Sequence, residues 1–190
     1  MPSPFNSSPI QAGTTNSLSA LRGSSRSLLS ALQAKTQPCC CIVPDEDMVP
    51  QVEDDLKLFS NLPVFTYPGY EIPPYTPLSP DPLTTAARLS TLYRLHETKS
   101  SFLLVVSAEA LMRRTLPGTV LFNHAELLLS GEECDRDDLL SKLDDLGYKQ
   151  VNLVQSIGDY SVRGGILDIY PPSFLTGKKL HKSPLRLDFF

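Results

Sequence analysis

The sequence predicts an α/β fold class, in which a partial α/β domain is followed by a small α+β module. Three observations support this prediction. Strand-like and helix-like patterns alternate as far as about residue 117. The run SFLLVVS at 101–107 is apolar almost throughout, as in a strand buried within a parallel sheet. Beyond Pro117-Gly118, short runs alternate apolar and polar residues, which is typical of half-exposed antiparallel strands.

The chain is expected to have three parts. Residues 1–17 are rich in Ser, Pro and Asn and predict a disordered arm. The α/β segment covers 18–117, and the α+β module covers 118–190. The chain ends at Phe190 in the middle of a predicted strand, so we expect the module to be truncated and the chain to be a fragment of a longer protein.

The α/β segment is predicted to alternate helices and strands around a Pro-rich loop. Strands are expected at 39–43, 63–67 and 101–107, and helices after the turn at 23–25, from Pro50, from Asp81-Pro82 and at 108–114. Each of the first three helices has an apolar face that we expect to be buried: Leu28, Leu29 and Leu32; Val52, Leu56 and Phe59; Leu83, Ala87, Leu92 and Leu95.

Three consecutive cysteines, Cys39 to Cys41, lie in the first predicted strand. Neighbouring strand residues point to opposite faces, so the triplet cannot form a compact metal site by itself. Because Ile42 and Val43 follow, the run predicts a buried strand of small apolar residues in a reducing cytosol. A cytoplasmic location is expected.

In the α+β module, residues 119–133 are predicted to be strand-like. Residues 134–148 predict an amphipathic helix that Asp135 caps and Gly147 ends. Its inward residues are expected to be Leu139, Leu140, Leu143 and Leu146. Strands follow at 151–155, 165–170 and 185–189, and the insertion GKKLHKS before the last strand predicts a hairpin loop.

Composition excludes several classes of function. The net charge is −4, and from Pro117 onward there are eight basic and eleven acidic residues. Phosphate neutralisation usually requires a basic excess, so this chain alone should bind DNA poorly. The sequence has no apolar run long enough to span a membrane, and its polar N-terminus does not resemble a signal peptide.

The turn at Gly23, Ser24, Ser25 and Arg26 occupies the place of a phosphate-binding loop but lacks its chemistry. Such a loop needs a lysine for the terminal phosphates, and no lysine occurs before Lys35. The turn is therefore predicted not to bind nucleotide. The three histidines are scattered, and no nucleophile and base are paired in the sequence. We expect this chain to be no enzyme and to need no cofactor or metal.

Two arginines near the end of the chain are candidate binding residues. Arg163 precedes Gly164-Gly165, which we expect to let the strand bend or bulge and aim Arg163 outward. Alternation places Arg186 and Phe190 on one face of the last strand, and Arg163 joins them if the two strands pair. Arginines beside an exposed aromatic are typical protein-interface anchors. The alternative, equally open on composition, is a surface ion pair with Asp168 or Asp188.

Several stretches resemble the N-terminal region of the bacterial transcription-repair coupling factor (Mfd) family. They are TYPGYEIPPYTPLSP, AARLSTLYRL, VVSAEALMRRTLP and LGYKQVNLVQSIGDYSVRGGILDIYPPS, and the resemblance runs from about Ser24 to Phe190. It implies a degenerate RecA-like domain without a P-loop, followed by a module like the second domain of the excinuclease subunit UvrB. In the family this module binds the damage-recognition subunit UvrA, and the contacts correspond to Arg163, Arg186 and Phe190 here.

The resemblance also implies what this chain lacks. Family members bind RNA polymerase and double-stranded DNA, and move along DNA with an ATP- and magnesium-dependent motor, through parts outside these residues. The leading hypothesis is therefore a non-enzymatic module that recruits UvrA to stalled RNA polymerase. The alternative is a fragment of UvrB or of an ATP- and DNA-binding helicase-like domain that contacts damaged DNA directly.

Overall fold

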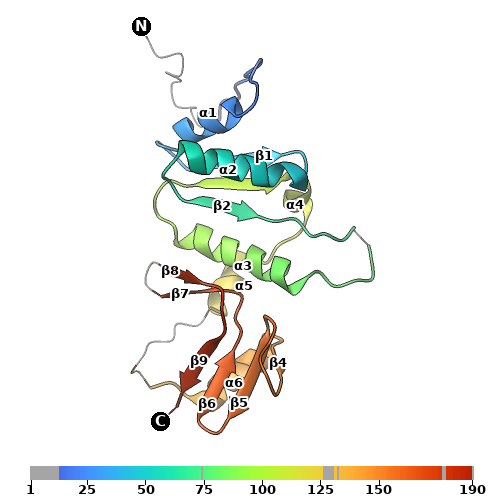
Figure 1. Ribbon diagram of the computed structural model, residues 1–190, viewed down its shortest axis with the longest axis vertical. Helices are drawn as coiled ribbons and strands as arrows, with labels where there is room; N and C mark the ends of the chain where they lie inside the picture. The colour runs from blue at the N-terminus through green and yellow to red at the C-terminus, as the bar shows by residue number, and fades with distance from the viewer. Residues whose placement is uncertain (1–12, 74, 126–130, 132, 177–178, 190) are drawn as a thin grey trace. The chain divides into compact units, whose positions relative to one another are not determined.

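The computed structural model describes residues 13–73, 75–125, 131, 133–176 and 179–189. The chain divides into two compact units (Figure 1). Unit 1 combines Met1–Gly69 with Arg94–Arg114, and unit 2 combines Tyr70–Tyr93 with Thr115–Phe190. The predicted division into an arm, a segment ending at 117 and a C-terminal module stays a prediction.

Unit 1 is built on a three-stranded parallel sheet. Its order is β1 (Cys39–Val43), β3 (Leu103–Ser107) and β2 (Val64–Tyr67), so β3 is central. Leu103, Val105 and Val106 in β3 are fully buried. The prediction of a parallel strand at 101–107 with both faces covered is confirmed, and the other two strands lie where the sequence predicted them.

Helices α1 (Ser25–Gln33) and α2 (Val49–Phe59) bury apolar side chains in the core of unit 1. A short 3₁₀ turn, η1 (Glu46–Met48), precedes α2, and α4 (Ala108–Met112) follows β3. In α2 the predicted face is confirmed, with Leu56 fully buried and Val52 and Phe59 packed against the core. In α1 the prediction is wrong: the buried residues are Ser27 and Ala31, and the three leucines are only half-buried. Small side chains there allow α1 to approach its neighbours closely.

The predicted buried face of α3 (Pro82–Glu97) is also wrong. Leu83 is 64% exposed, whereas Ala86, Arg88 and Thr91 are buried. The guanidinium of Arg88 lies 4.3 Å from the centre of the Tyr70 ring, so an aromatic contact replaces the expected leucine packing.

The cysteine strand is less buried than predicted. Cys40 is exposed, Cys39 and Cys41 are half-buried, and Ile42 is 61% exposed. The reason is topological, because β1 is a terminal strand of its sheet and its apolar sequence does not require both faces to be covered.

Unit 2 contains a four-stranded sheet in the order β4 (Lys149–Gln150), β5 (Asp159–Arg163), β6 (Ile166–Ile169) and β9 (Leu185–Asp188). β4 is parallel to β5, and the other neighbours are antiparallel. Strands β7 (Phe174–Thr176) and β8 (Lys179–His181) form a separate antiparallel pair, which confirms the hairpin predicted for the insertion.

Helix α6 (Arg136–Asp145) lies behind the four-stranded sheet in Figure 1. Its N-cap is confirmed, since the Asp135 carboxylate accepts hydrogen bonds from the Asp137 and Asp138 N–H groups at 2.9 and 3.0 Å. Gly147 follows the helix at φ +81°, as the predicted stop requires. The helix buries Leu139 and Leu143 against the sheet, whereas Leu146 is 43% exposed, contrary to prediction.

Two predicted strands of the module are wrong. Residues 118–123 form a helix, α5 (Gly118–Asn123), where a strand was expected; 126–130 and 132 lie outside the described residues. An apolar run this short fits either structure. The strand predicted at 151–155 ends at Gln150 instead. The Asp159 carboxylate accepts hydrogen bonds from the Gln155 and Ser156 N–H groups, at 3.2 and 2.8 Å, and so folds the segment into a loop.

Candidate functional site

The Gly164-Gly165 pair forms the tight turn of the β5–β6 hairpin. Arg163 and Ile166 are cross-strand partners on either side of it. Gly164 has φ +60°, a conformation that side-chain-bearing residues rarely adopt. The bend or bulge predicted at Gly164-Gly165 is therefore a two-residue turn between two strands. Arg163 is exposed at the end of β5, as predicted.

The four-stranded sheet has one apolar face and one polar face. Tyr160, Leu167 and Ile169 pack with α6. Side chains alternate along a strand and cross-strand partners share a face, so the intervening residues lie on the opposite side. We call that side the polar face; its residues are Ser161, Arg163, Ile166, Asp168, Arg186 and Asp188. It thus brings together Arg163 and Arg186, which are 23 positions apart in the printed sequence.

Asp168 in β6 connects Arg186 to the middle of the polar face. Arg186 Nε and Nη2 donate hydrogen bonds to the two Asp168 carboxylate oxygens at 2.6 and 2.9 Å. The side chain of Arg186 is 61% exposed and that of Asp168 only 16%. The hydrogen bonds from Arg186, with the positive charges of Arg186 and Arg163, hold the pKa of Asp168 below its ordinary value, against the opposing effect of burial. The surface ion pair that the sequence offered as the alternative to a binding role is therefore present, between Arg186 and Asp168.

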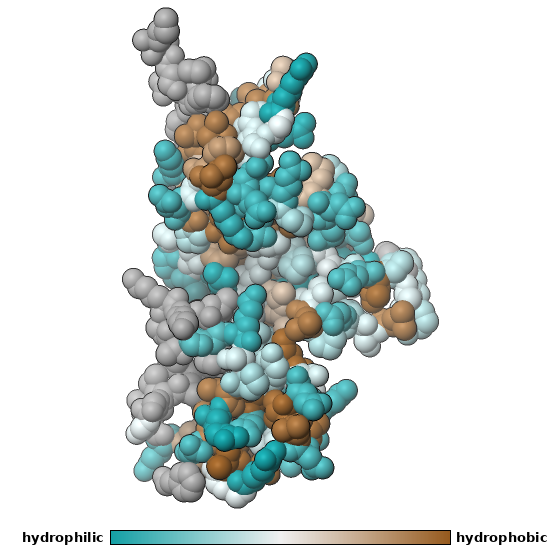
Figure 2. Space-filling model, in the orientation of Figure 1, coloured by the Kyte–Doolittle hydropathy of each residue, from teal (hydrophilic) through white to brown (hydrophobic). Residues whose placement is uncertain are grey.

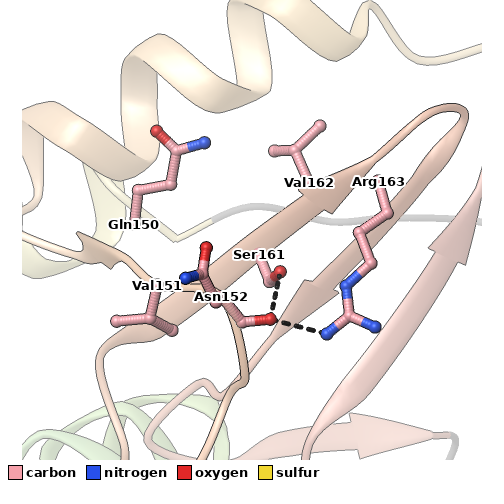
Figure 3. Close-up of a pocket in the computed structure, with 6 residues that line it drawn as sticks. All are labelled: Gln150, Val151, Asn152, Ser161, Val162 and Arg163. Carbon is pink, nitrogen blue, oxygen red and sulfur yellow. Dashed lines mark hydrogen bonds between the residues drawn. The ribbon is translucent and has the colours of Figure 1, made fainter.

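Arg163 is held by a backbone carbonyl. Its Nη2 donates a hydrogen bond to the Asn152 carbonyl oxygen at 2.6 Å, and the Ser161 hydroxyl donates to the same oxygen at 3.3 Å (Figure 3). Residues 150–152 and 161–163 line a shallow pocket at this place. Sequence reasoning missed Asn152, because a backbone carbonyl leaves no trace in the choice of residue.

Phe190, the third predicted site residue, lies outside the described residues. Its neighbour Phe189 packs with the apolar cluster under the sheet, and the Phe189 N–H donates to the Gly165 carbonyl at 2.8 Å. Of the three predicted site residues, the structure therefore brings together Arg163 and Arg186.

The surface of unit 2 carries a mixture of polar and apolar area. In Figure 2 hydrophilic (teal) and hydrophobic (brown) residues are interspersed over the strands of the four-stranded sheet. Leu153, beside Asn152, is 61% exposed. Such mixed surfaces suit protein contacts better than they suit a phosphate backbone.

The Asp55 carboxylate lies beside the turn at Gly23–Arg26 and the start of α1. Gly23 has φ +51°. The Ser24 and Ser27 hydroxyls donate hydrogen bonds to the two Asp55 carboxylate oxygens, at 2.9 and 3.2 Å. The first turn of α1 therefore has a negative group beside it, where the helix dipole favours one.

No catalytic constellation emerges from the described part of the chain. Across those residues no group of three or more His, Cys, Asp or Glu side chains is arranged to hold a metal ion. His124 Nδ1 hydrogen-bonds the Val120 carbonyl of its own helix at 2.7 Å. Of the described helices, none has both the length and the apolar character needed to cross a bilayer.

Comparisons with known proteins give a consistent result. A family profile described as the UvrB interaction domain matches residues 127–190. The transcription-repair-coupling factor of Escherichia coli is 34% identical over 184 residues, which is 96% of this chain and 15% of that protein. The protein of the same name from Myxococcus xanthus is 33% identical over 190 residues (95% and 15%), and that from Bacillus subtilis 33% over 177 residues (91% and 14%). The chain thus spans about 15% of the length of these relatives.

Proposed function

We propose, from the premise that this chain corresponds to the N-terminal region of bacterial transcription-repair-coupling factors and includes their UvrB interaction domain, that it serves transcription-coupled DNA repair as a docking module for UvrA. In this role it brings the damage-recognition subunit of nucleotide excision repair to a stalled RNA polymerase. The finer description, a degenerate RecA-like domain followed by a module like the second domain of UvrB, is part of the proposal.

The observation that carries the proposal is the placement of Arg163 and Arg186 on one polar face, on either side of Asp168. Each arginine has one part of its guanidinium fixed by the chain, by a carbonyl in one case and a carboxylate in the other. A guanidinium has five N–H groups, so donors remain to meet acceptors of a partner. Fixing the side chains beforehand lowers the entropy lost on binding.

Phe190 is proposed as the apolar member of the same contact, although it lies outside the described residues. An aromatic anchor beside two arginines is a common composition for the energetic centre of a protein interface. The exposed Leu153 follows Asn152, whose carbonyl holds Arg163, and provides further apolar area in that loop.

We propose that this chain itself is no enzyme and binds no cofactor. The support is the Asp55 carboxylate, which accepts hydrogen bonds from the Ser24 and Ser27 hydroxyls at the degenerate loop of Gly23, Ser24, Ser25 and Arg26. A phosphate in this place would meet a like charge. The ATP- and magnesium-dependent translocation, and the contacts with RNA polymerase and double-stranded DNA, are proposed for the parts of the whole protein beyond this chain. A cytoplasmic location is proposed with them.

The UvrB-fragment alternative is not favoured. The similarity to the coupling factors of Escherichia coli and Myxococcus xanthus extends over 96% and 95% of this chain. Direct contact with damaged DNA also conflicts with the acidic balance from Pro117 onward, where eleven acidic residues face eight basic ones.

The proposal is tested by titrating purified UvrA with the chain and with its Arg163→Ala variant, using calorimetry. We expect the variant to bind at least about tenfold more weakly, which corresponds to about 1.4 kcal/mol. Arg26→Ala removes an exposed arginine on α1 and is the matched control, with binding unchanged. Equal affinity of the folded Arg163→Ala variant and the wild type would refute the assignment.

A further inference from the structure

Both carbonyl groups of the Gly164-Gly165 turn accept hydrogen bonds from outside the hairpin. Arg136, the first residue of α6, donates from Nη1 to the Gly164 carbonyl oxygen at 3.2 Å. The Phe189 N–H, just beyond β9, donates to the Gly165 carbonyl oxygen at 2.8 Å. The turn that follows Arg163 is therefore held by a side chain of the helix and by the main chain next to the neighbouring strand.

A turn made of two glycines depends on such restraints, because residues without a Cβ reach left-handed and right-handed conformations with equal ease. Hairpin turns of types I′ and II′ share a positive φ at the first central residue, as Gly164 has at +60°. They differ in the orientation of the peptide group between the two central residues. The Gly164 carbonyl belongs to that peptide group. A donor that binds its oxygen therefore favours one orientation of the turn over the other.

Arg136 is itself directed toward the turn by its neighbours in the chain. It follows Asp135, whose carboxylate caps α6 and so fixes the first turn of the helix. Its Nε and Nη2 donate to Asp137 Oδ1 at 3.2 and 3.1 Å, which leaves Nη1 for the Gly164 carbonyl. The side chains of Arg136 and Asp137 are 41% and 81% exposed, so this ion pair adds little to stability. Its effect is to orient the guanidinium.

We propose that Arg136 is a positioning residue for UvrA docking, which holds the Gly164-Gly165 turn in the conformation that directs Arg163 toward the partner. This inference rests on the proposed function. Arg163 ends β5 and pairs with Ile166 across the turn, so the turn fixes the direction in which its side chain leaves the strand. The Asn152 carbonyl holds the other end of that side chain. Losing either restraint leaves Arg163 more orientations to give up on binding.

Arg136→Ala should therefore weaken UvrA binding while the module stays folded. The turn then populates both orientations, and the affinity falls with the competent fraction, roughly three- to tenfold in calorimetry. Urea unfolding of the variant should differ little from that of the wild type, because the contact is exposed. Lys142→Ala is the matched control, since it removes one positive charge from the same helix at a side chain that is 45% exposed. It should bind UvrA as the wild type does.

A double-mutant cycle separates positioning from a direct contact with UvrA. If Arg136 acts through Arg163, Arg136→Ala should cost little further affinity in a chain that already carries Arg163→Ala. Full additivity of the two losses would show that Arg136 acts independently of Arg163 and would overturn the inference. The loss in Arg136→Ala should also persist at high salt. A loss that disappears there would come from long-range charge and would overturn the inference too.

Nuclear magnetic resonance of the free chain tests the turn without UvrA. We expect one set of Gly164 and Gly165 amide signals in the wild type and in Lys142→Ala. In Arg136→Ala these signals should broaden by exchange or split into two sets. A single sharp set in Arg136→Ala would show that the turn does not need the side chain, and would overturn the inference.

The binding experiments also distinguish this inference from the proposed function. A wild-type chain that does not bind UvrA, or a folded Arg163→Ala variant that binds it fully, would refute the proposed function and this inference with it. Weak binding by Arg163→Ala together with full affinity in Arg136→Ala would refute this inference alone.

Discussion

Arg186 on β9 and Asp168 on β6 meet through two parallel hydrogen bonds, one to each carboxylate oxygen, at 2.6 and 2.9 Å. The contact fixes the plane of the guanidinium, although the Arg186 side chain is 61% exposed. At such exposure an ion pair adds little to stability. Its greater effect is on the direction in which Arg186 points.

Replacing Asp168 by Asn should therefore impair binding more than folding. The amide keeps the size of the side chain but offers one oxygen instead of two and places N–H groups against a cation. We expect several-fold weaker UvrA binding by calorimetry and a loss of less than about 1 kcal/mol in urea unfolding. Asp188→Asn, on the same face but outside this ion pair, is the control. Unchanged UvrA affinity in Asp168→Asn would show that binding does not depend on the orientation that Asp168 gives to Arg186.

Charge reversal at Arg186 should cost more affinity than truncation. Arg186→Ala removes the donors, whereas Arg186→Glu also places a carboxylate beside Asp168 and opposite the acceptors of the partner. We expect affinity for UvrA to fall in the order wild type, Ala, Glu. Surface plasmon resonance at two salt concentrations measures the order. If the two variants bind alike, then repulsion plays no part and Arg186 lies at the rim of the interface.

The Tyr160 hydroxyl should stabilise the module until the pH becomes strongly alkaline. It donates to the Asp144 carboxylate at 2.7 Å, and this hydrogen bond, with burial and the Asp144 charge, raises its pKa to about 12. The unfolded value is about 10, so the contribution is complete below pH ~10 and is lost as the pH rises through 12. At pH 7 the free energy of unfolding of Tyr160→Phe should be about 1 kcal/mol lower than that of the wild type. The stability curves of the two proteins, measured by urea titration, should approach each other between pH ~10 and about 12; parallel curves would contradict this.

Substitution of Gly164 tests the hairpin turn. A Cβ there meets no atom within 4 Å, so the cost comes from the backbone alone, at φ +60°. Gly164→Ala should lower the unfolding free energy by ~1 kcal/mol. Gly164→Asn should cost less, because asparagine tolerates the left-handed region. Equal destabilisation by Ala and Asn, in thermal melts, would show that the turn has another conformation.

ATP should not protect this chain against heat. Any ligand that binds the folded state with useful affinity raises the unfolding temperature. The Ser24 and Ser27 hydroxyls already donate hydrogen bonds to the Asp55 carboxylate. We therefore expect magnesium and ATP to leave the unfolding temperature unchanged in differential scanning fluorimetry. A shift that disappears in Ser24→Ala would establish a nucleotide site at this turn.

The secondary-structure elements that the sequence predicted correctly are those with explicit local signals. The strand at 101–107 was identified because both of its faces are buried, and α6 because its capping residue and its glycine stop are both explicit. Prediction failed on α3, where a buried arginine stacks on Tyr70, since a charged residue indicates a solvent-facing position. It failed on α5 because a short apolar run fits a strand equally well.

For the candidate site, alternation correctly assigned Arg163 and Arg186 to one face once the strands paired. The contact that orients Arg163 could not be predicted from residue types. It comes from a main-chain oxygen, whose position depends on the path of a loop rather than on a particular side chain.

This use of a main-chain oxygen gives the site an uneven resistance to genetic change. Every amino acid at position 152 supplies the same carbonyl, so a missense change there leaves the acceptor of Arg163 in place. A single-residue insertion or deletion between Gln150 and Asp159 moves that oxygen while leaving both arginines intact. Coding variants that alter the length of this loop are thus the ones to screen for loss of the proposed UvrA docking in an otherwise folded protein.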